Sequence, residues 1–169
     1  MDYSIRLLMK DDEPFLWKML YEAAHMAQEG ESTVQAIMNH PEIAKYVEGW
    51  GRAGDIGCVA TIVNSNQPIG AAWLRLLTGD NKGYGYVDDE TPELAIAVLP
   101  EHRGKGVGTQ LLTHLLAVAK NFYPSVSLST RPTNPALRLY ERMGFKIIEG
   151  SDFINRIGGT SLTMKVDFF

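Results

Sequence analysis

The segment best suited to hold a ligand runs from Val98 to Thr109 and reads VLPEHRGKGVGT. A strand-like run ends there, a short turn follows, and a long helix with apolar periodicity begins. The first N–H groups of a helix have no acceptor within it, and the positive end of the helix dipole lies beside them. Because Gly104, Gly106 and Gly108 leave such amides uncovered, the segment predicts a seat for a phosphate or pyrophosphate.

Two common phosphate-binding sequences do not fit this segment. A P-loop requires Gly-Lys followed by Ser or Thr, whereas Lys105 is followed by Gly106. A dinucleotide fingerprint requires Gly-x-Gly-x-x-Gly, and the third position after Gly106 is Thr109. The remaining alternative is a glycine-rich helix start without a ligand. A glycine costs about 0.5–1 kcal/mol relative to alanine within a helix, which disfavours that alternative.

A second motif covers residues 134 to 145 and reads NPALRLYERMGF. Asn134 followed by proline favours a helix start, and Gly144 favours a helix end. Together with Arg103-x-x-Gly106-x-Gly108, this motif resembles the paired signature of the GNAT superfamily of N-acetyltransferases. The resemblance is strongest between residues 93 and 145.

The resemblance implies that acetyl-CoA lies between two splayed neighbouring strands. Its pantetheine arm is then expected to pair with the strand backbone at Ile96 and Val98. Its pyrophosphate is expected to take the amides of Gly104, Lys105, Gly106, Val107, Gly108 and Thr109.

Three further side chains have two interpretations under this resemblance. Those of Arg103 and Lys105 either contact the cofactor phosphates or are solvated surface charges. Asn134 caps its helix and is also expected to contact the cofactor arm.

The resemblance also implies two catalytic residues. A phenol is protonated at neutral pH, so Tyr140 is expected to donate to the departing sulfur as general acid. Its alternative role is to pack a helix onto the sheet. Amines of the lysine type are mostly protonated at pH 7, and Glu93 matches the place of an acidic group that acts as base, directly or through water. The alternative for Glu93 is a solvated carboxylate at the end of a strand.

The function expected from the resemblance is direct transfer of an acetyl group from acetyl-CoA to a primary amine in a ternary complex. A non-catalytic acyl-CoA-binding or sensing module of the same fold is the alternative. The acceptor is expected to be a small-molecule or peptide amine. The resemblance implies that the loops 25–32 and 150–160 shape the pocket that binds it. Four acids in the loop 78–92 favour a cationic acceptor, namely Asp80, Asp88, Asp89 and Glu90.

The elements that must position these residues alternate between strands and helices. Strands are predicted at 3–8, 58–63, 69–77, 93–99, 126–129, 146–149 and 161–166. Helices are predicted at 15–27, more weakly at 32–46, and at 104–122 and 135–143. This order predicts an α/β domain around one mixed sheet. The resemblance implies a mostly antiparallel sheet with a splayed parallel pair, flanked by helices.

Composition narrows the class of protein. The 169 residues suit one domain, spanning 1–169, with 45% hydrophobic residues and a net charge of −4 that argues against general nucleic-acid binding. Cys58 is the one cysteine, so no intramolecular disulfide can form. The apolar runs are too short for a membrane span. A cytoplasmic monomer or small oligomer, such as a homodimer, is expected. No metal is expected, because the histidines lack ligand spacing: His25, His40, His102 and His114.

Overall fold

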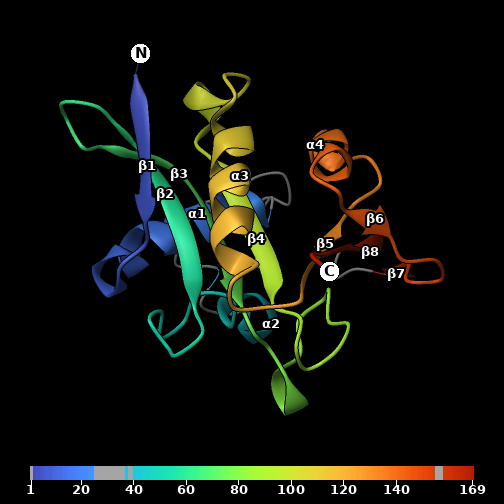
Figure 1. Ribbon diagram of the computed structural model, residues 1–169. Coiled ribbons are helices and arrows are strands. Elements are labelled where there is room, and N and C mark those ends of the chain that lie inside the picture. The colour runs from blue at the N-terminus through green and yellow to red at the C-terminus, as the bar shows by residue number, and fades with distance from the viewer. Residues whose placement is uncertain (1, 25–36, 38–39, 155–157) are drawn as a thin grey trace.

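A central sheet organises the computed structural model, which describes residues 2–24, 37, 40–154 and 158–169 (Figure 1). Its strands are β1 Tyr3–Leu7, β2 Ile56–Ile62, β3 Pro68–Arg75, β4 Glu93–Val98, β5 Ser125–Thr130, β6 Lys146–Ile147, β7 Phe153–Ile154 and β8 Thr160–Asp167. The helices of the described ranges are α1 Glu13–Ala23, α2 Pro41–Ala44, α3 Val107–Ala119 and α4 Leu137–Arg142, with short 3₁₀ turns that include Pro100–His102.

The sheet is mixed, in the strand order β1-β2-β3-β4-β5-β8-β6, with β7 paired to β8. Among the strand pairs of the described residues, all are antiparallel except β4 with β5. These two parallel strands pair at one position, Glu93 with Ser127, and diverge beyond it. The prediction of a mostly antiparallel mixed sheet with a splayed parallel pair is therefore confirmed.

Helices cover both faces of this sheet (Figure 1). Side chains of a strand alternate between faces, so β4 contributes to two separate apolar clusters. Leu94 and Ile96 pack on the side of α3 and α4. Ala95 and Ala97 pack on the opposite side, with α1 and α2. The gap between β4 and β5 thus lies between two layers of helices.

The largest differences between the predicted and the observed helix boundaries concern the first three helices. The helix predicted from residue 104 begins at Val107, because Gly104 and Gly106 adopt left-handed φ values of +75° and +83°. Of the helix predicted at 15–27, α1 ends at Ala23, and residues 25–27 lie outside the described residues. Within the predicted stretch 32–46, the structure describes the short helix α2, which begins at Pro41.

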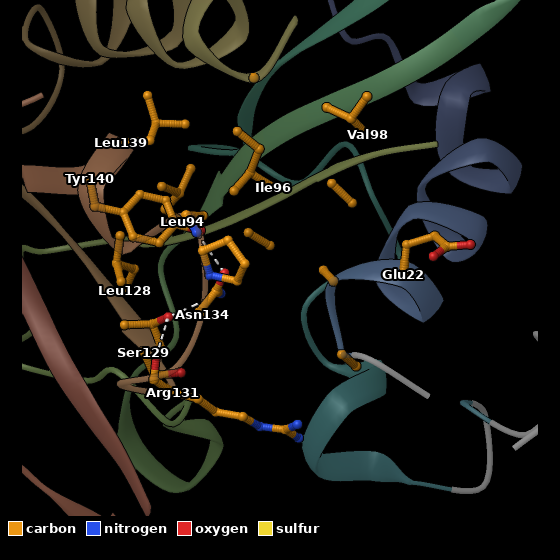
Figure 2. Close-up of a pocket in the computed structure, with 18 of the residues that line it drawn as sticks. Glu22, Leu94, Ile96, Val98, Leu128, Ser129, Arg131, Asn134, Leu139 and Tyr140 are labelled. Atoms are coloured by element: carbon orange, nitrogen blue, oxygen red, sulfur yellow. Dashed lines mark hydrogen bonds between the residues drawn. The ribbon is translucent and has the colours of Figure 1, made fainter. Parts of the chain in front are cut away.

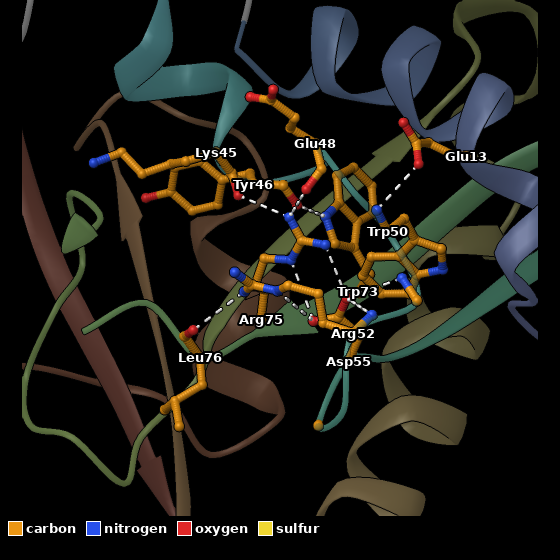
Figure 3. A network of polar contacts seen from close by, with 12 residues as sticks. Glu13, Lys45, Tyr46, Glu48, Trp50, Arg52, Asp55, Trp73, Arg75 and Leu76 are labelled. Atoms are coloured by element: carbon orange, nitrogen blue, oxygen red, sulfur yellow. Dashed lines mark hydrogen bonds and ion pairs between the residues drawn. The ribbon is translucent and has the colours of Figure 1, made fainter. Parts of the chain in front are cut away.

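A buried ion pair ties the end of β3 to the segment after α2 (Figure 3). The guanidinium of Arg75 is 1% exposed, and its Nη2 lies 2.8 Å from Oδ2 of Asp55. Its Nη1 donates to the carbonyl oxygens of Lys45 and Glu48, at 3.0 and 2.6 Å. The ring of Trp50 lies 5.6 Å from the guanidinium carbon. The backbone carbonyls of Lys45 and Glu48 are thereby held in place by Arg75.

Trp73, two residues before Arg75 on β3, contacts the same segment through another backbone carbonyl. The indole N–H of Trp73 donates to the carbonyl oxygen of Tyr46 at 2.9 Å. Arg75 and Trp73 lie on the same face of β3, two residues apart, as the period of a strand requires. The position of Tyr46 is therefore set by β3.

Candidate active site

A cavity of about 780 Å³ opens where β4 and β5 diverge (Figure 2). Its lining includes Ile96 and Tyr140 from the α3 side of the sheet and Tyr46 and Ala95 from the α1 side. This volume lies within the range of about 300–1,000 Å³ that is common for ligand and cofactor sites. The cavity is thus reached by residues of both layers.

The glycine-rich turn before α3 forms one wall of the cavity. The first hydrogen bond of the helix joins the N–H of Gln110 to the carbonyl of Gly106 at 3.1 Å. The amides of Val107, Gly108 and Thr109 therefore have no acceptor within the helix. Of residues 103–110, all line the cavity except Lys105 and Gln110. The amides fit the phosphate seat that the sequence predicts.

Gly104 and Gly106 allow the left-handed backbone conformation that this turn requires. Their left-handed φ values are costly for any residue with a Cβ. A Cβ placed at either position would meet nothing within 4 Å, so the space beside them is open. Of the three glycines, Gly108 alone lies inside α3.

Replacing Gly106 with valine is expected to weaken CoA binding about tenfold or more. The branched side chain enters open space at the cavity wall, and the left-handed backbone it strains positions the helix amides. Loss of a single hydrogen bond to a charged phosphate already accounts for about that factor. Titration calorimetry with CoA measures the change.

Gly150→Val is the matched control for this substitution. Gly150 has a similar φ of +77° and open space around it, but it lies outside the lining of the cavity. Both variants should lose comparable stability, and only Gly106→Val should lose affinity. Equal affinity in the two variants would contradict the assignment of the turn to the phosphates.

The two basic residues of the turn have different surroundings. Arg103 lines the cavity, donates from Nε to the carbonyl of Val98 at 2.9 Å, and pairs with Glu22 at 3.2 Å. Arg103 therefore links the end of β4 to α1, and it already occupies a carbonyl that was expected to pair with the pantetheine arm. Lys105 is exposed and does not line the cavity, which favours its interpretation as a surface charge.

Tyr140 lies on α4 with its ring against the cavity (Figure 2). Burial raises the pKa of its hydroxyl to about 12, so the phenol keeps its proton at neutral pH. The ring of Phe145 packs edge-on at a centroid distance of 6.1 Å. None of the hydrogen bonds in the described ranges involves the Tyr140 hydroxyl. The Tyr140 hydroxyl is thus a protonated donor at the cavity, with no hydrogen-bond partner among the described residues.

The turn before α4 and the end of α4 form as the motif predicts. Asn134 lines the cavity, accepts from the N–H of Ala136 at 2.8 Å, and donates to the hydroxyl of Thr130 at 3.1 Å. Gly144 adopts a φ of +100°, and the N–H of Phe145 reaches back to the carbonyl of Tyr140. This geometry terminates α4 and fixes Tyr140 beside β5.

Glu93 is buried, contrary to its interpretation as a solvated strand-end carboxylate. The residue is 2% exposed and does not line the cavity. Its Oε1 accepts from the hydroxyl of Tyr46 at 2.8 Å and from the N–H of Gly85 at 2.7 Å. Its Oε2 is buried without a hydrogen-bond partner in the described residues. Burial raises the pKa of this carboxyl, despite the hydrogen bonds that favour its ionised form.

Tyr46 connects Glu93 to the cavity, and no sequence motif pointed to it. Its ring lines the cavity, and its hydroxyl also accepts from the N–H of Tyr84 at 2.9 Å. Tyr84 in turn stacks on Phe153 at 6.0 Å, with the two rings nearly parallel. Tyr46 lies far from Glu93 along the chain, so a local pattern could not reveal the pair.

The raised pKa of Glu93 predicts how stability depends on pH. The folded protein keeps the Glu93 proton to a higher pH than the unfolded chain, so it binds more protons above the ordinary value of 4.5. The free energy of unfolding therefore falls as pH rises through that window. Glu93→Gln removes this contribution, and the variant should lose less stability between pH 4 and 8 than the parent. Urea unfolding at stepped pH measures the difference.

Glu149→Gln, which replaces an exposed carboxylate, is the control for this measurement. Its pH dependence should match that of the parent. A parent-like slope in Glu93→Gln as well would show that Glu93 titrates alike in the folded and unfolded chain.

Several other predictions concern residues away from the cavity. The acids Asp80, Asp88, Asp89 and Glu90 do not line it, and Asp88 and Asp89 accept hydrogen bonds within their own loop. These four acids are therefore not part of the cavity wall, and a cationic acceptor stays a prediction. Cys58 is buried, and burial raises the pKa of its thiol to about 11, as suits a small core residue. The loop 25–32 lies outside the described residues.

Two searches of the described ranges bear on membranes and metals. None of the helices there combines the length and the apolar character needed to cross a bilayer. No group of three or more His, Cys, Asp or Glu side chains is placed to hold a metal ion in that part of the chain.

Comparison with known proteins identifies the family. A model of the acetyltransferase (GNAT) family matches residues 17–145, which is most of the chain. The chain belongs to the GNAT family of acetyltransferases. A comparison with curated protein sequences gave no significant match. The GNAT chain is therefore an acyltransferase by family, with the turn 103–108 and α4 inside the matched region.

Solved structures share the fold of this GNAT chain at low identity. A protein inferred to be a phosphinothricin N-acetyltransferase is 21% identical, covers 99% of both chains and has a TM-score of 0.71. The yncA protein of Salmonella typhimurium, solved with acetyl-CoA, is 18% identical over 99% of this chain and 94% of that chain, with a TM-score of 0.68.

A third structure was solved with both of its ligands. The aminoglycoside acetyltransferase AAC(6')-Ib in complex with coenzyme A and kanamycin is 19% identical, over 99% of this chain and 95% of that chain, with a TM-score of 0.66. Similarity at this level establishes the GNAT fold for the present chain.

Proposed function

We propose that this GNAT-family protein transfers the acetyl group of acetyl-CoA to a primary amine directly, within a ternary complex. The observation that carries the proposal is a single cavity between β4 and β5, lined from both layers of the domain. The amides of residues 107–109 and Tyr140 approach it from the α3 side, and Tyr46 approaches it from the α1 side. Two substrates that enter from opposite faces can meet there without a covalent enzyme intermediate.

The residues of the α3 side fit coenzyme A. Uncovered amides at the start of α3 suit a diphosphate, and the unpaired edge of β4 at Ile96 suits an amide-bearing arm. We assign the diphosphate to residues 104–109 and the arm to Ile96 and Asn134. Acetyl-CoA, when bound, supplies the activated thioester.

We assign proton transfer to residues on both faces. The amine nitrogen forms a bond to the acetyl carbon, the bond from that carbon to sulfur breaks, and the nitrogen loses a proton. Tyr140, protonated and free of internal hydrogen bonds in the described ranges, donates its proton to the departing sulfur. Glu93 accepts the amine proton through the hydroxyl of Tyr46, which lies 2.8 Å from its carboxylate.

Release of free thiol from acetyl-CoA across a panel of primary amines tests the proposal. The expected result is release that requires both the protein and an amine, with one acetylated amine formed for each thiol. If acetyl-CoA raises the melting temperature but no amine is acetylated, the alternative of a non-catalytic acyl-CoA-binding module is favoured instead. Cytoplasmic location and a homodimer stay predictions.

A further inference from the structure

We infer that the segment 83–85 positions Tyr46 and Glu93 for proton transfer, and that Ser127 acts on the reaction by holding this segment. The inference rests on the proposed function, in which the amine proton passes through Tyr46 to Glu93. It goes beyond that function by assigning the residues that fix the two groups relative to each other. Gly83, Gly85 and Ser127 do not line the cavity, so they are positioning residues rather than catalytic ones.

Two consecutive backbone amides of the segment hold the two groups. The N–H of Tyr84 donates to the hydroxyl oxygen of Tyr46 at 2.9 Å, and the N–H of Gly85 donates to Oε1 of Glu93 at 2.7 Å. The same Oε1 accepts from the hydroxyl of Tyr46 at 2.8 Å. One short stretch of backbone therefore fixes both ends of the hydrogen bond between Tyr46 and Glu93.

These contacts also set the direction of the Tyr46 hydroxyl. A hydroxyl has one hydrogen to donate and two lone pairs that can accept. The hydrogen is directed to Glu93, and one lone pair accepts from the N–H of Tyr84. Within the described residues, the second lone pair is left for the N–H of an amine in the cavity, which the Tyr46 side chain lines. The amine proton can thus move from the cavity toward the carboxylate.

The segment can approach this closely because residues 83 and 85 are glycines. A Cβ at Gly83 would overlap the carboxylate oxygens of Glu93 and the hydroxyl of Tyr46. A Cβ at Gly85 would lie 2.9 Å from the carbonyl carbon of Leu128, in the backbone of β5. Neither glycine has a left-handed φ. Lack of space, rather than backbone conformation, therefore requires glycine at both positions.

Ser127 fixes the segment to β5 at the point where β4 and β5 begin to diverge. Its hydroxyl donates to the carbonyl oxygen of Gly85 at 2.7 Å, and Ser127 is the residue of β5 that pairs with Glu93. Gly85 thus bridges the two strands, with its N–H on the Glu93 side chain and its carbonyl on Ser127. Because Ser127 is fully buried, removal of its hydroxyl takes this donor from a buried carbonyl.

The pH dependence of kcat/KM in Ser127→Ala tests the inference. The hydrogen bond from Gly85 favours the ionised form of Glu93, so a loosened segment should raise the pKa of that carboxyl further. Among the described residues, the other titratable groups that act on it are Tyr46 and Lys45, which the substitution leaves in place. The ratio of variant to parent kcat/KM cancels the ionisation of the amine. This ratio should be about one-tenth at the acidic end of the profile and rise toward one at the alkaline end.

Ser125→Ala is the matched control for Ser127→Ala. Ser125 is also buried on β5, and its hydroxyl is hydrogen-bonded to that of Thr91 at 2.6 Å, outside the lining of the cavity. Both variants should lose comparable stability in urea unfolding. The kcat/KM ratio of Ser125→Ala should stay close to one at every pH.

Gly83→Ala tests the segment without removing a hydrogen-bonding side chain. Its methyl group meets the ends of the Glu93 and Tyr46 side chains, which can move, so the variant should fold but separate the pair. We expect kcat to fall about tenfold or more. Gly79→Ala, in open space of the same loop, should keep a kcat close to that of the parent. Calorimetry should give all four variants the CoA affinity of the parent.

Two results would overturn the inference while the proposed function stands. One is a kcat/KM ratio for Ser127→Ala that does not change with pH or that equals the ratio for Ser125→Ala. The other is parent-like kcat in Gly83→Ala. If the parent protein acetylates no amine, the proposed function itself fails, and the inference fails with it.

Discussion

Tyr140→Phe is expected to lower turnover by about 10²-fold or more while affinity for CoA changes little. The substitution removes the proton that we assign to the departing sulfur. It keeps the ring that packs against Phe145, and it leaves no partner unsatisfied among the described residues. Steady-state kinetics with a responsive amine and calorimetry with CoA measure the two effects separately.

Tyr123→Phe is the matched control for this loss of a phenol. The hydroxyl of Tyr123 donates to the carbonyl of Gly54 at 2.7 Å, outside the lining of the cavity. Its loss should leave turnover close to that of the parent. Parent-like turnover in Tyr140→Phe would remove Tyr140 from the mechanism, and a parallel fall in CoA affinity would assign it to binding.

Asp55→Ala is expected to cost about 3–5 kcal/mol of unfolding free energy, because it leaves the guanidinium of Arg75 buried without its counter-ion. Asp55 is 3% exposed, and its Oδ2 also accepts from the N–H groups of Gly51 and Arg52. The loss should extend to the site, since Arg75 holds the backbone on either side of Tyr46. Urea unfolding measures the stability.

An exposed ion pair of the same length provides the control. Arg6 and Asp12 are also 2.8 Å apart, with the Arg6 side chain 46% exposed. Asp12→Ala should cost about 1 kcal/mol or less for the ion pair and about 1 kcal/mol for the lost acceptor of the Met9 N–H, which donates to Oδ2 of Asp12 at 2.7 Å. In addition, Arg75→Met in the Asp55→Ala background should recover part of the stability, because it removes the unpaired charge. Equal losses in the two aspartate variants, without recovery, would mean that burial does not govern the Arg75 pair.

The local motifs of this protein could be predicted because their function depends on neighbours in sequence. The open amides at the start of α3 follow from helix geometry, and the left-handed turn at Gly104 and Gly106 needs glycine at those positions. The end of α4 at Gly144 likewise follows from a local rule. Propensity alone did not separate the turn at residues 104–106 from the first turn of α3.

The surroundings of individual site residues could not be predicted in the same way. The sequence left Glu93 as either a base or a solvated carboxylate, and the structure buries it behind Tyr46. The acids of the loop 78–92 suggested an acidic entrance, but they lie outside the lining of the cavity. In both cases the decisive neighbours come from other elements of the fold.

The sequence by itself determined the main order of strands and helices, the glycine-rich turn before α3 and the resemblance to the GNAT family. These features depend on the spacing of residues that are close together in the sequence, so hydrophobic periodicity and turn-forming residues predict them. Only the tertiary structure decided which side chains share the cavity: it joined Tyr46 to Glu93 across 47 residues and brought Tyr46 and Tyr140 to the same cavity from opposite faces of the sheet. Burial and charge at a site are sums over neighbours that are distant in the chain, so they appear only when the sheet has formed.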